Sequence, residues 1–551
     1  MNSSEIKKIK NEYDSKFHSA YQLLNEQQKL AVDTIEGPVL VVAGPGTGKT
    51  QIIAARIANI LSIGVDAKPH NILCLTYTDA GAIAMRKRLL EFIGPIAHKV
   101  NIYTFHAFCN DVIQHHPQFF LKRESEPVSD LELAAIYHEL IDELPEGHSL
   151  RRLKGEIYFE AKRLKSLFSL MKKEDWSAEK IIEAVDKHIA ELPLMDEFIC
   201  KRASGIYKKG DVRTDKIQEE VEKFNLLKDA AVLFEKFDAK MKARARYDYD
   251  DMILWVIKAF KENELLLLEY QERFQYVLVD EFQDTSGSQK EILELLISYW
   301  GQDANVFIVG DDDQSIYEFQ GARLDNIVNF YEQFEESIKP IVLTNNYRST
   351  QKILDASKAT IDKNKQRLIH LIKKEGLVLD KNLVASNPKI ISQEAPTPKV
   401  VEYYNSFHEE ADIVLQLEKL HQAGHNLSEV AVLYSQHKQA ANIIKLLEKK
   451  GIPYNVKKRE DLLKIPLVNY FINVLEYLQE ESSKAFSGEE ILFHLMHYPG
   501  LQINPIDIAL LSYHVSQKPR TEKKQWRLSL DNALELSTLN LSSQNKIIQL
   551  G

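Results

Sequence analysis

Short apolar runs without a polar face recur in the first part of the chain. They lie at 38–43 (PVLVVA), 72–76 (ILCLT), 276–281 (YVLVDE) and 305–310 (NVFIVG). Strands that are apolar on both faces are typical of a parallel sheet covered on both sides. Helix-like stretches, such as residues 50–61, follow these runs. The alternation of strand and helix patterns predicts an α/β fold with a parallel sheet.

The pattern changes between about residues 110 and 246. Helix formers with many Lys and Glu replace the short apolar runs there. We therefore expect a helical insertion at 111–246, which divides a first α/β domain into 1–110 and 247–340. The basic clusters of the insertion are interpreted as solvated helix faces. They comprise Arg151, Arg152 and Lys154; Lys162, Arg163 and Lys165; and Lys172 and Lys173.

A second α/β pattern follows. Residues 341–346 (IVLTNN), 399–404 (KVVEYY) and 430–435 (VAVLYS) are predicted strands, with helical patterns between them. From about residue 482 the pattern is helical again. We expect a second α/β domain at 341–481 and the start of a second helical insertion at 482–551.

Composition limits the class of protein. A chain of 551 residues is too long for one hydrophobic core. The net charge of −10 argues against a wholly basic nucleic-acid binder, although a local basic groove is sufficient for binding. The three cysteines form no C-x-x-C pair, which argues against a disulfide framework or a structural zinc site and fits the cytoplasm. We see no signal peptide or membrane span, and expect no membrane partner.

The segment AGPGTGKT directly follows the first apolar run and opens a helix. This is the context of a phosphate-binding Walker A loop. Backbone N–H groups at its glycines can surround phosphate oxygens. Lys49 is placed to reach the β- and γ-phosphates of ATP, and the Thr50 hydroxyl to bind Mg²⁺. The predicted ATP-binding loop is Ala43, Gly44, Pro45, Gly46, Thr47, Gly48, Lys49 and Thr50.

The segment DEFQDT begins at the end of another apolar run. Asp280 is expected to hold Mg²⁺, and Glu281 to polarise the attacking water. An acidic pair after a strand is weak evidence alone, but the upstream Walker A loop makes it strong. Phosphoryl transfer depends on charge neutralisation, so a cation from elsewhere in the chain is expected to complete the site.

Six further motifs occur in a fixed order: 24–28 (LNEQQ), 76–89 (TYTDAGAIAMRKRL), 104–109 (TFHAFC), 247–252 (YDYDDM), 310–322 (GDDDQSIYEFQGA) and 343–350 (LTNNYRST). With the two phosphate motifs, they resemble the UvrD/PcrA/Rep family of superfamily-one DNA helicases over about residues 23–478. The resemblance implies two RecA-like P-loop domains, the second incomplete here, with helical insertions. It also implies ATP and Mg²⁺ as cofactors, and ATP-driven 3′–5′ movement on single-stranded DNA or 3′-tailed duplexes.

The resemblance implies roles for single residues as well. Gln28 would read the adenine ring and Tyr347 would stack on it. Gln314 would contact the γ-phosphate, and Arg348 would be an arginine finger reaching across from the second domain. The implied DNA contacts are Tyr77, His106, Tyr317 and Phe319. Aromatic stacking suits a motor that walks on any sequence, whereas core packing or helix capping is the alternative role for these side chains.

Several positions depart from the family pattern. Phe319 and Gln320 stand where Trp and Arg are usual, and Asp79 and Ala80 where Asn and Lys are common. Gln51 replaces a basic residue after the Walker threonine. These differences affect the predicted contacts with DNA more than the predicted ATP site.

The family's motifs V and VI are not found in the sequence. We therefore expect a piece of a longer protein that is weakly active or inactive alone. A helicase–nuclease of the RecB/AddA type remains an alternative, as does a non-hydrolysing ATP-binding module. Intact Lys49, Asp280, Glu281, Gln314 and Arg348 argue against the module. The sequence indicates neither the pathway, such as DNA repair, nor the protein partners.

Overall fold

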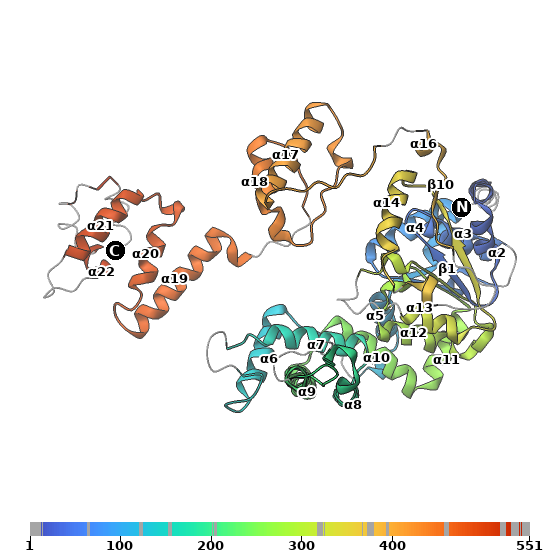
Figure 1. Cartoon of the computed structure of the whole chain (residues 1–551), viewed down its shortest axis with the longest axis horizontal. Helices are drawn as coiled ribbons and strands as arrows, with labels where there is room; N and C mark the ends of the chain where they lie inside the picture. Colours follow the sequence, from blue (N-terminus) through green and yellow to red (C-terminus); the bar gives the residue numbers. More distant parts are fainter. Residues whose placement is uncertain are drawn as a thin grey trace. The chain divides into compact units, whose positions relative to one another are not determined.

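The computed structural model describes residues 13, 15–62, 67–120, 125–151, 157–200, 202, 207–316, 323, 325–365, 367–371, 380–392, 396–456, 462–517, 525–530, 539 and 541–542. The chain divides into two compact units, Met1–Lys399 and Val400–Gly551, which Figure 1 shows in sequence colours. Among the described residues, none of the helices combines the length and apolar character needed to cross a membrane.

A six-stranded sheet forms the centre of the first unit. Its strand order is β3-β2-β6-β7-β1-β8, and all five pairings are parallel. The strands are β1 (Val39–Ala43), β2 (Ile72–Thr76), β3 (Asn101–Thr104), β6 (Tyr276–Val279), β7 (Val306–Gly310) and β8 (Lys339–Leu343). Every residue of β1, β2, β6 and β7 is buried. The predicted α/β fold with a parallel sheet is confirmed.

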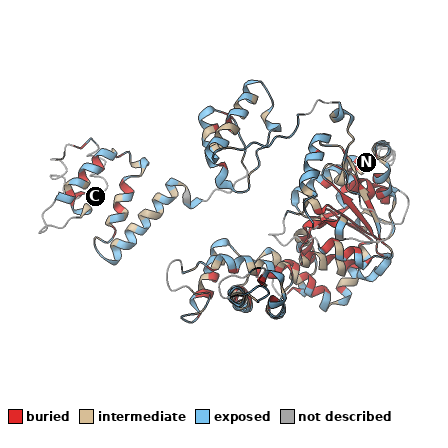
Figure 2. Ribbon diagram, viewed as in Figure 1, coloured by how far each residue is buried: buried red, intermediate tan, exposed pale blue. Residues whose placement is uncertain are grey.

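Two layers of helices cover the sheet. Along β1, Val39 and Val41 face one hydrophobic core, whereas Leu40 and Val42 face the other, as the alternation of a strand requires. Figure 2 shows the resulting buried interior in red. On the first face lie α2 (Glu26–Asp33), α3 (Lys49–Ser62) and α4 (Asp79–Ile93). On the second lie α5 (Phe105–His115), α10 (Tyr249–Glu262), α11 (Glu264–Arg273), α12 (Gly287–Ile297) and α13 (Asp325–Gln333).

Helices occupy the segment where the sequence predicts an insertion. They are α6 (Asp130–Asp142), α7 (Ala161–Lys173), α8 (Ala178–Glu191) and α9 (Thr214–Ala243), and they pack around a core of their own. Two short parallel strands, β4 (Glu126–Pro127) and β5 (Arg246–Tyr247), pair where the chain enters and leaves this bundle.

The predicted domain boundary at residue 341 falls inside a strand. Ile341 is paired with Val41 of β1, so this apolar run completes the first sheet and does not begin a second one. The open edge of β1 supplies hydrogen-bond partners that the local sequence does not reveal. The rest of the first unit contains β9 (Asn345–Asn346), β10 (Val384–Ala385), α14 (Gln351–Ile361), α15 (Leu368–Leu371) and α16 (Pro388–Ile391).

The second unit is helical in its described part. Its helices are α17 (Ser406–Gln422), α18 (Ala440–Lys450), α19 (Pro466–Ser483), α20 (Glu489–Met496), α21 (Pro505–Gln517) and α22 (Trp526–Leu530). The predictions of strands at 399–404 and 430–435 are wrong, because these two fully described segments form no strand. Tyr404 and Leu433 are exposed. An apolar run becomes a strand only when a neighbouring strand completes its hydrogen bonds.

Candidate phosphate-binding site

The predicted Walker A loop links β1 to α3. Gly46 and Gly48 have φ values of 72° and 89°, a left-handed conformation that favours glycine. The Thr47 hydroxyl donates to the Gly44 carbonyl oxygen at 2.8 Å, which closes the loop on itself. Because α3 begins at Lys49, the unpaired N–H groups of its first turn lie next to the loop, as in an anion-binding site.

A cavity of about 490 Å³ lies over this loop. Its size is that of a small-molecule site. It brings together residues from the predicted ATP loop with Glu281, Gln314 and Arg348, which are far apart in the sequence. The lining residues are Pro45, Gly46, Gly48, Lys49, Thr50, Gln51, Ala84, Lys87, Arg88, Glu91, Glu281, Gln314 and Arg348.

Lys49 and Glu281 form an ion pair at the cavity wall. Lys49 Nζ lies 2.6 Å from Glu281 Oε2, and Gln283 Nε2 donates to the same oxygen at 2.9 Å. Glu281 has a φ of 50° and a ψ of 46°, a left-handed conformation that is unusual outside glycine. The chain turns there from β6 into the 3₁₀ helix η6 (Phe282–Asp284). Such backbone strain is concentrated at functional positions.

Asp280 makes this corner acidic. Its side chain follows β6 and is buried, and Oδ1 accepts the Glu281 N–H at 3.0 Å. Burial, together with the charge of Glu281, raises the pKa of Asp280 to about 6, against the opposing effect of Lys49. Burial and the same glutamate raise the pKa of Asp284 to about 6. Carboxylate oxygens are donors that hard divalent cations such as Mg²⁺ prefer.

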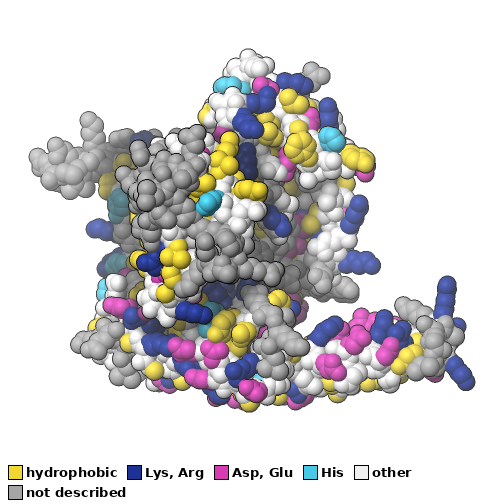
Figure 3. All heavy atoms as spheres, turned by 90° about the vertical axis from the view of Figure 1, so that its left-hand side faces the viewer, with side chains coloured by type: hydrophobic (Ala, Val, Ile, Leu, Met, Phe, Trp, Pro, Cys, Tyr) yellow, Lys and Arg dark blue, Asp and Glu magenta, His cyan; other side chains and the backbone are white. Residues whose placement is uncertain are grey.

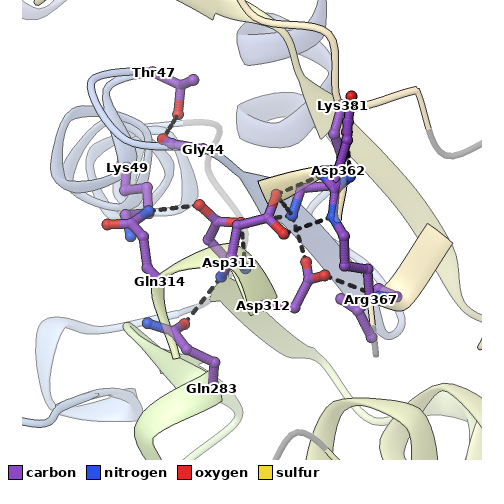
Figure 4. Close-up of polar contacts among 12 residues, drawn as sticks. Gly44, Thr47, Lys49, Gln283, Asp311, Asp312, Gln314, Asp362, Arg367 and Lys381 are labelled. Atoms are coloured by element: carbon purple, nitrogen blue, oxygen red, sulfur yellow. Dashed lines mark hydrogen bonds and ion pairs between the residues drawn. The ribbon is translucent and has the colours of Figure 1, made fainter. Parts of the chain in front are cut away.

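Gln314 ends the 3₁₀ helix η8 (Asp312–Gln314), which follows β7. Its Nε2 donates to Asp311 Oδ2 at 2.7 Å. The Asp311 N–H donates in turn to Gln283 Oε1 at 2.9 Å (Figure 4). The loop that carries Glu281 and the loop that carries Gln314 are therefore joined directly.

Gln28 and Tyr347 both contact the backbone of the phosphate loop. Gln28 forms a capping box with Asn25 at the start of α2, and its Nε2 donates to the Thr47 carbonyl oxygen at 2.9 Å. The Tyr347 N–H donates to the Gly46 carbonyl oxygen at 2.9 Å, and the Tyr347 hydroxyl accepts from Asn25 Nδ2 at 2.9 Å. Both residues stabilise the loop, whereas their contact with adenine stays a prediction.

Arg348 lies in a different place from the one predicted. The sequence suggests that it reaches across from a second domain, but it belongs to the first unit and lines the cavity directly. A Cβ atom at Gly46 would be 2.7 Å from Arg348 Cβ. The reason is the position of β8, which pairs with β1 and so delivers the following residues to the phosphate loop.

The structure describes two of the four residues that are predicted to contact DNA. Tyr77 and His106 follow the ends of β2 and β3, so both lie near the carboxyl edge of the sheet that also carries the phosphate loop. His106 Nε2 is 3.7 Å from Asp250 Oδ1. Tyr317 and Phe319 lie outside the described residues. Basic and acidic side chains are interspersed on the face shown in Figure 3.

The sequence does not predict that the side chains of two lysines are buried. Lys172 is not part of a solvated face, because its side chain is 2% exposed and it contacts Asp248 and Asp251. Its spacing of four residues from buried Phe168 is a signal that could have placed it on the apolar side of α7. Lys381 is also buried, against the aspartates that precede Gln314, and no local pattern indicates this.

Two family models and several curated proteins are similar to this chain. Residues 24–335 match the family model of the UvrD/REP helicase N-terminal domain, and residues 341–494 match that of the UvrD-like helicase C-terminal domain. The "ATP-dependent DNA helicase PcrA" of Leuconostoc citreum is 28% identical over 438 residues, which are 79% of this chain and 49% of that protein. The protein of the same name from Bacillus subtilis (strain 168) is 29% identical over 439 residues, 79% of this chain and 50% of that protein.

The chain therefore spans about half the length of the curated relatives it matches. The N-terminal family model alone covers residues 24–335 of the 551. That match includes the phosphate loop, the acidic pair at the end of β6 and the Gln314 loop. The chain belongs to the UvrD/REP helicase family.

Proposed function

We propose that this chain supplies the Mg·ATP site of a helicase in which ATP hydrolysis drives 3′–5′ movement along single-stranded DNA and separates the strands of 3′-tailed duplexes, and that the chain alone has weak activity or none. The observation that carries the proposal is the cavity that brings Lys49, Glu281, Gln314 and Arg348 to one place. The relatives are named ATP-dependent DNA helicases, which favours this function over a helicase–nuclease or a non-hydrolysing module. The three buried free cysteines suit a cytoplasmic protein.

The residues present fit Mg·ATP. The phosphate loop offers N–H groups to the phosphate oxygens, and Lys49 adds a positive charge. The Thr50 hydroxyl and the Asp280 carboxylate would hold Mg²⁺, since both are oxygen donors of the kind this ion takes. The ion, when bound, neutralises charge on the β- and γ-phosphates.

Glu281 is the proposed general base. In the structure its Oε2 accepts from both Lys49 and Gln283. A γ-phosphate offers Lys49 a second anion, and transfer of Lys49 to it would leave the carboxylate to orient the attacking water. Arg348 lines the same cavity, so it is placed to stabilise negative charge on the γ-phosphoryl group.

The DNA strand is proposed to contact Tyr77 and His106, together with Tyr317 and Phe319. Stacking of a base on an aromatic ring contributes about 1–3 kcal/mol and tolerates any sequence. The carboxyl edge of the sheet, where Tyr77 and His106 lie, also carries the phosphate loop. This shared edge offers a short route between nucleotide and DNA.

The test compares Lys49→Ala and Glu281→Gln with two surface controls. Lys258→Ala and Glu262→Gln alter an exposed pair on α10, whose side chains are 73% and 63% exposed. Nucleotide affinity and phosphate release are measured with and without single-stranded DNA. Lys49→Ala should lose nucleotide binding. Glu281→Gln should keep binding and lose hydrolysis, because the carboxylate acts on water and not on the bound nucleotide.

Both control variants should behave like the wild type. Phosphate release by Glu281→Gln at the wild-type rate would refute the assignment of the base. A strand-separation assay with 3′-tailed and 5′-tailed duplexes tests the polarity, and unwinding of the 5′-tailed duplex alone would refute the proposed direction.

A further inference from the structure

Three consecutive aspartates follow β7 and are largely shielded from water. The side chains of Asp311, Asp312 and Asp313 are 1%, 0% and 17% exposed. One carboxylate oxygen of each lies within 4.8 Å of those of the other two. Carboxylates this close repel one another when buried, so they require cations or protons nearby.

One buried ammonium group contacts all three carboxylates. Lys381 Nζ lies 2.7 Å from Asp311 Oδ1 and 2.7 Å from Asp313 Oδ2, and it also contacts Asp312 Oδ1. Its side chain is 6% exposed. Burial opposes the positive charge, but the aspartates outweigh it and raise the pKa of Lys381. The lysine therefore stays charged and neutralises part of the cluster.

A second cation completes the arrangement. Arg367 Nε and Nη2 donate to the two oxygens of Asp313 at 2.7 Å each. Its Nη1 donates to Asp362 Oδ1 at 2.7 Å. Asp313 thus has a bidentate partner of its own, whereas Asp311 and Asp312 depend on Lys381 as their charged partner among the described residues.

The carboxylate of Asp311 also binds Gln314. Oδ1 accepts from Lys381, and Oδ2 accepts from Gln314 Nε2 at 2.7 Å. Through its N–H group Asp311 reaches Gln283, which donates to Glu281. A continuous chain of hydrogen bonds therefore runs from Lys381 to the proposed general base, and Figure 4 labels Lys381, Asp311 and Gln283 along it.

The segment that carries Lys381 packs on the phosphate loop. A Cβ atom at Gly44 would lie 2.9 Å from the methyl groups of Leu383. Lys381 and Leu383 line one small cavity together with Gly44 and Pro45. Asn387 Nδ2 donates to the Tyr347 carbonyl oxygen at 3.0 Å. The position of the lysine is thus fixed relative to the site that it would influence.

We propose that Lys381 is a positioning residue for recognition of the γ-phosphate by Gln314. This inference rests on the proposed function, since the contact between Gln314 and the γ-phosphate belongs to it. A hydrogen bond to a carboxylate is stronger when that carboxylate carries its full charge. By sharing the charge of Asp311, Lys381 weakens the hold of Asp311 on Gln314 and leaves the amide able to exchange to phosphate.

Removal of the ammonium group has two consequences of the same sign. At a pH that keeps Asp311 ionised, its carboxylate binds Gln314 more tightly, and the uncompensated charge of the aspartates repels a triphosphate. Both effects weaken binding of ATP more than binding of ADP, which has no γ-phosphate. A loss of folding alone would weaken both nucleotides together.

The experiment uses the 551-residue chain and measures the dissociation constants of Mg·ADP and Mg·ATPγS. The readout is the ratio of the ADP constant to the ATPγS constant. Lys381→Met should lower this ratio about tenfold, the fold-change expected for one hydrogen bond to a charged group. Gln314→Ala should lower it similarly. The matched control is Lys389→Met, an exposed lysine of α16, which should leave the ratio unchanged.

A double variant tests the charge argument and serves if the single variant does not fold. Asp312→Asn removes one repelling charge, and the amide oxygen can still accept the Leu368 N–H, which lies 2.9 Å from the carboxylate. Combined with Lys381→Met, it should restore part of the ratio. The role of Lys381 is overturned if Gln314→Ala lowers the ratio of the dissociation constants but Lys381→Met, alone and combined with Asp312→Asn, leaves it at the wild-type value. That outcome leaves the proposed function intact. Equal weakening of the binding of both nucleotides by a Lys381→Met variant that folds like the wild type overturns the role of Lys381 as well. An unchanged ratio in Gln314→Ala overturns both the inference and the proposed γ-phosphate contact.

Discussion

Lys172 links α7, in the inserted helical bundle, to α10, which packs against one face of the sheet. Its Nζ is 2.7 Å from Asp248 Oδ2 and 2.8 Å from Asp251 Oδ1. Asp248 is the N-cap of α10, and Asp251 is the third residue of that helix. The substitution Lys172→Met keeps an unbranched apolar stem and removes the charge, so it tests the ion pair with little change in packing.

The expected cost follows from burial. The side chains of Lys172, Asp251 and Asp248 are 2%, 12% and 28% exposed. Removing one partner of a buried ion pair costs about 3–5 kcal/mol, because the remaining charges are left uncompensated. Water reaches Asp248 in part, so we expect the lower end, about 3 kcal/mol. Burial opposes the charge of Lys172, but the two aspartates outweigh it and raise its pKa. The contribution of the lysine charge is therefore lost as the pH rises through that raised pKa.

Native-state hydrogen exchange at the amides of α7 and α10 measures this cost locally. The control is Lys165→Met on the same helix. Lys165 Nζ lies 3.0 Å from Asp130 Oδ1, and the two side chains are 51% and 86% exposed. Such a surface pair is expected to contribute only about 0–1 kcal/mol. Lys172→Met combined with Asp248→Asn should recover part of the loss, since Asn caps a helix as well as Asp does. A loss for Lys172→Met no larger than that for Lys165→Met would refute the reasoning.

Two further predictions concern acidity and DNA. Burial and the charge of Glu281 raise the pKa of Asp284 to about 6, so the folded state binds its proton more tightly than the unfolded state and loses stability as the pH rises. Relative to Asp284→Asn, the wild type should lose about 1 kcal/mol between pH 5 and pH 8 in thermal unfolding, and a difference that does not change with pH would contradict this. Tyr77→Ala should weaken binding of a labelled single-stranded oligonucleotide by about 1–3 kcal/mol in fluorescence anisotropy, whereas an unchanged affinity would remove Tyr77 from the DNA path.

The parts of the fold that the sequence predicts are those set by local patterns. The phosphate loop is one, because the glycine positions, the lysine and the flanking apolar strand are contiguous from residue 38 to residue 50. The buried strands β1, β2, β6 and β7 are another, since a run that is apolar on both faces has few other stable environments in a folded protein. Their mutual order is not local, and it depends on which edges remain open for pairing.

The errors arise where a segment depends on a distant partner. Residues 341–343 and 430–433 are similar apolar runs, yet the first forms β8 against β1 and the second forms no strand. The difference lies in whether a strand edge is available, not in the residues themselves. Arg348 shows the same dependence, because pairing of β8 with β1 places it beside Gly46 and not on a separate domain.

Lys172 and Lys381 show how far such a partner can be anticipated. Each pairs with an acidic run from a different segment: Lys172 with Asp248 and Asp251, and Lys381 with residues 311–313. Both acidic runs adjoin elements that are largely buried in the core: residues 311–313 follow β7, and Asp248 and Asp251 lie at the start of α10. Several carboxylates at the border of a core need a cation to stay charged, so the two motifs predict that buried cations exist. They do not predict which residue supplies the charge, since any lysine or arginine brought there by the fold satisfies the electrostatics. The same argument separates the two sites. Lys172 joins two helices, so its removal should lower the stability of the fold. Lys381 and Gln314 bind the same carboxylate, that of Asp311, so removal of Lys381 should change the preference between ATP and ADP.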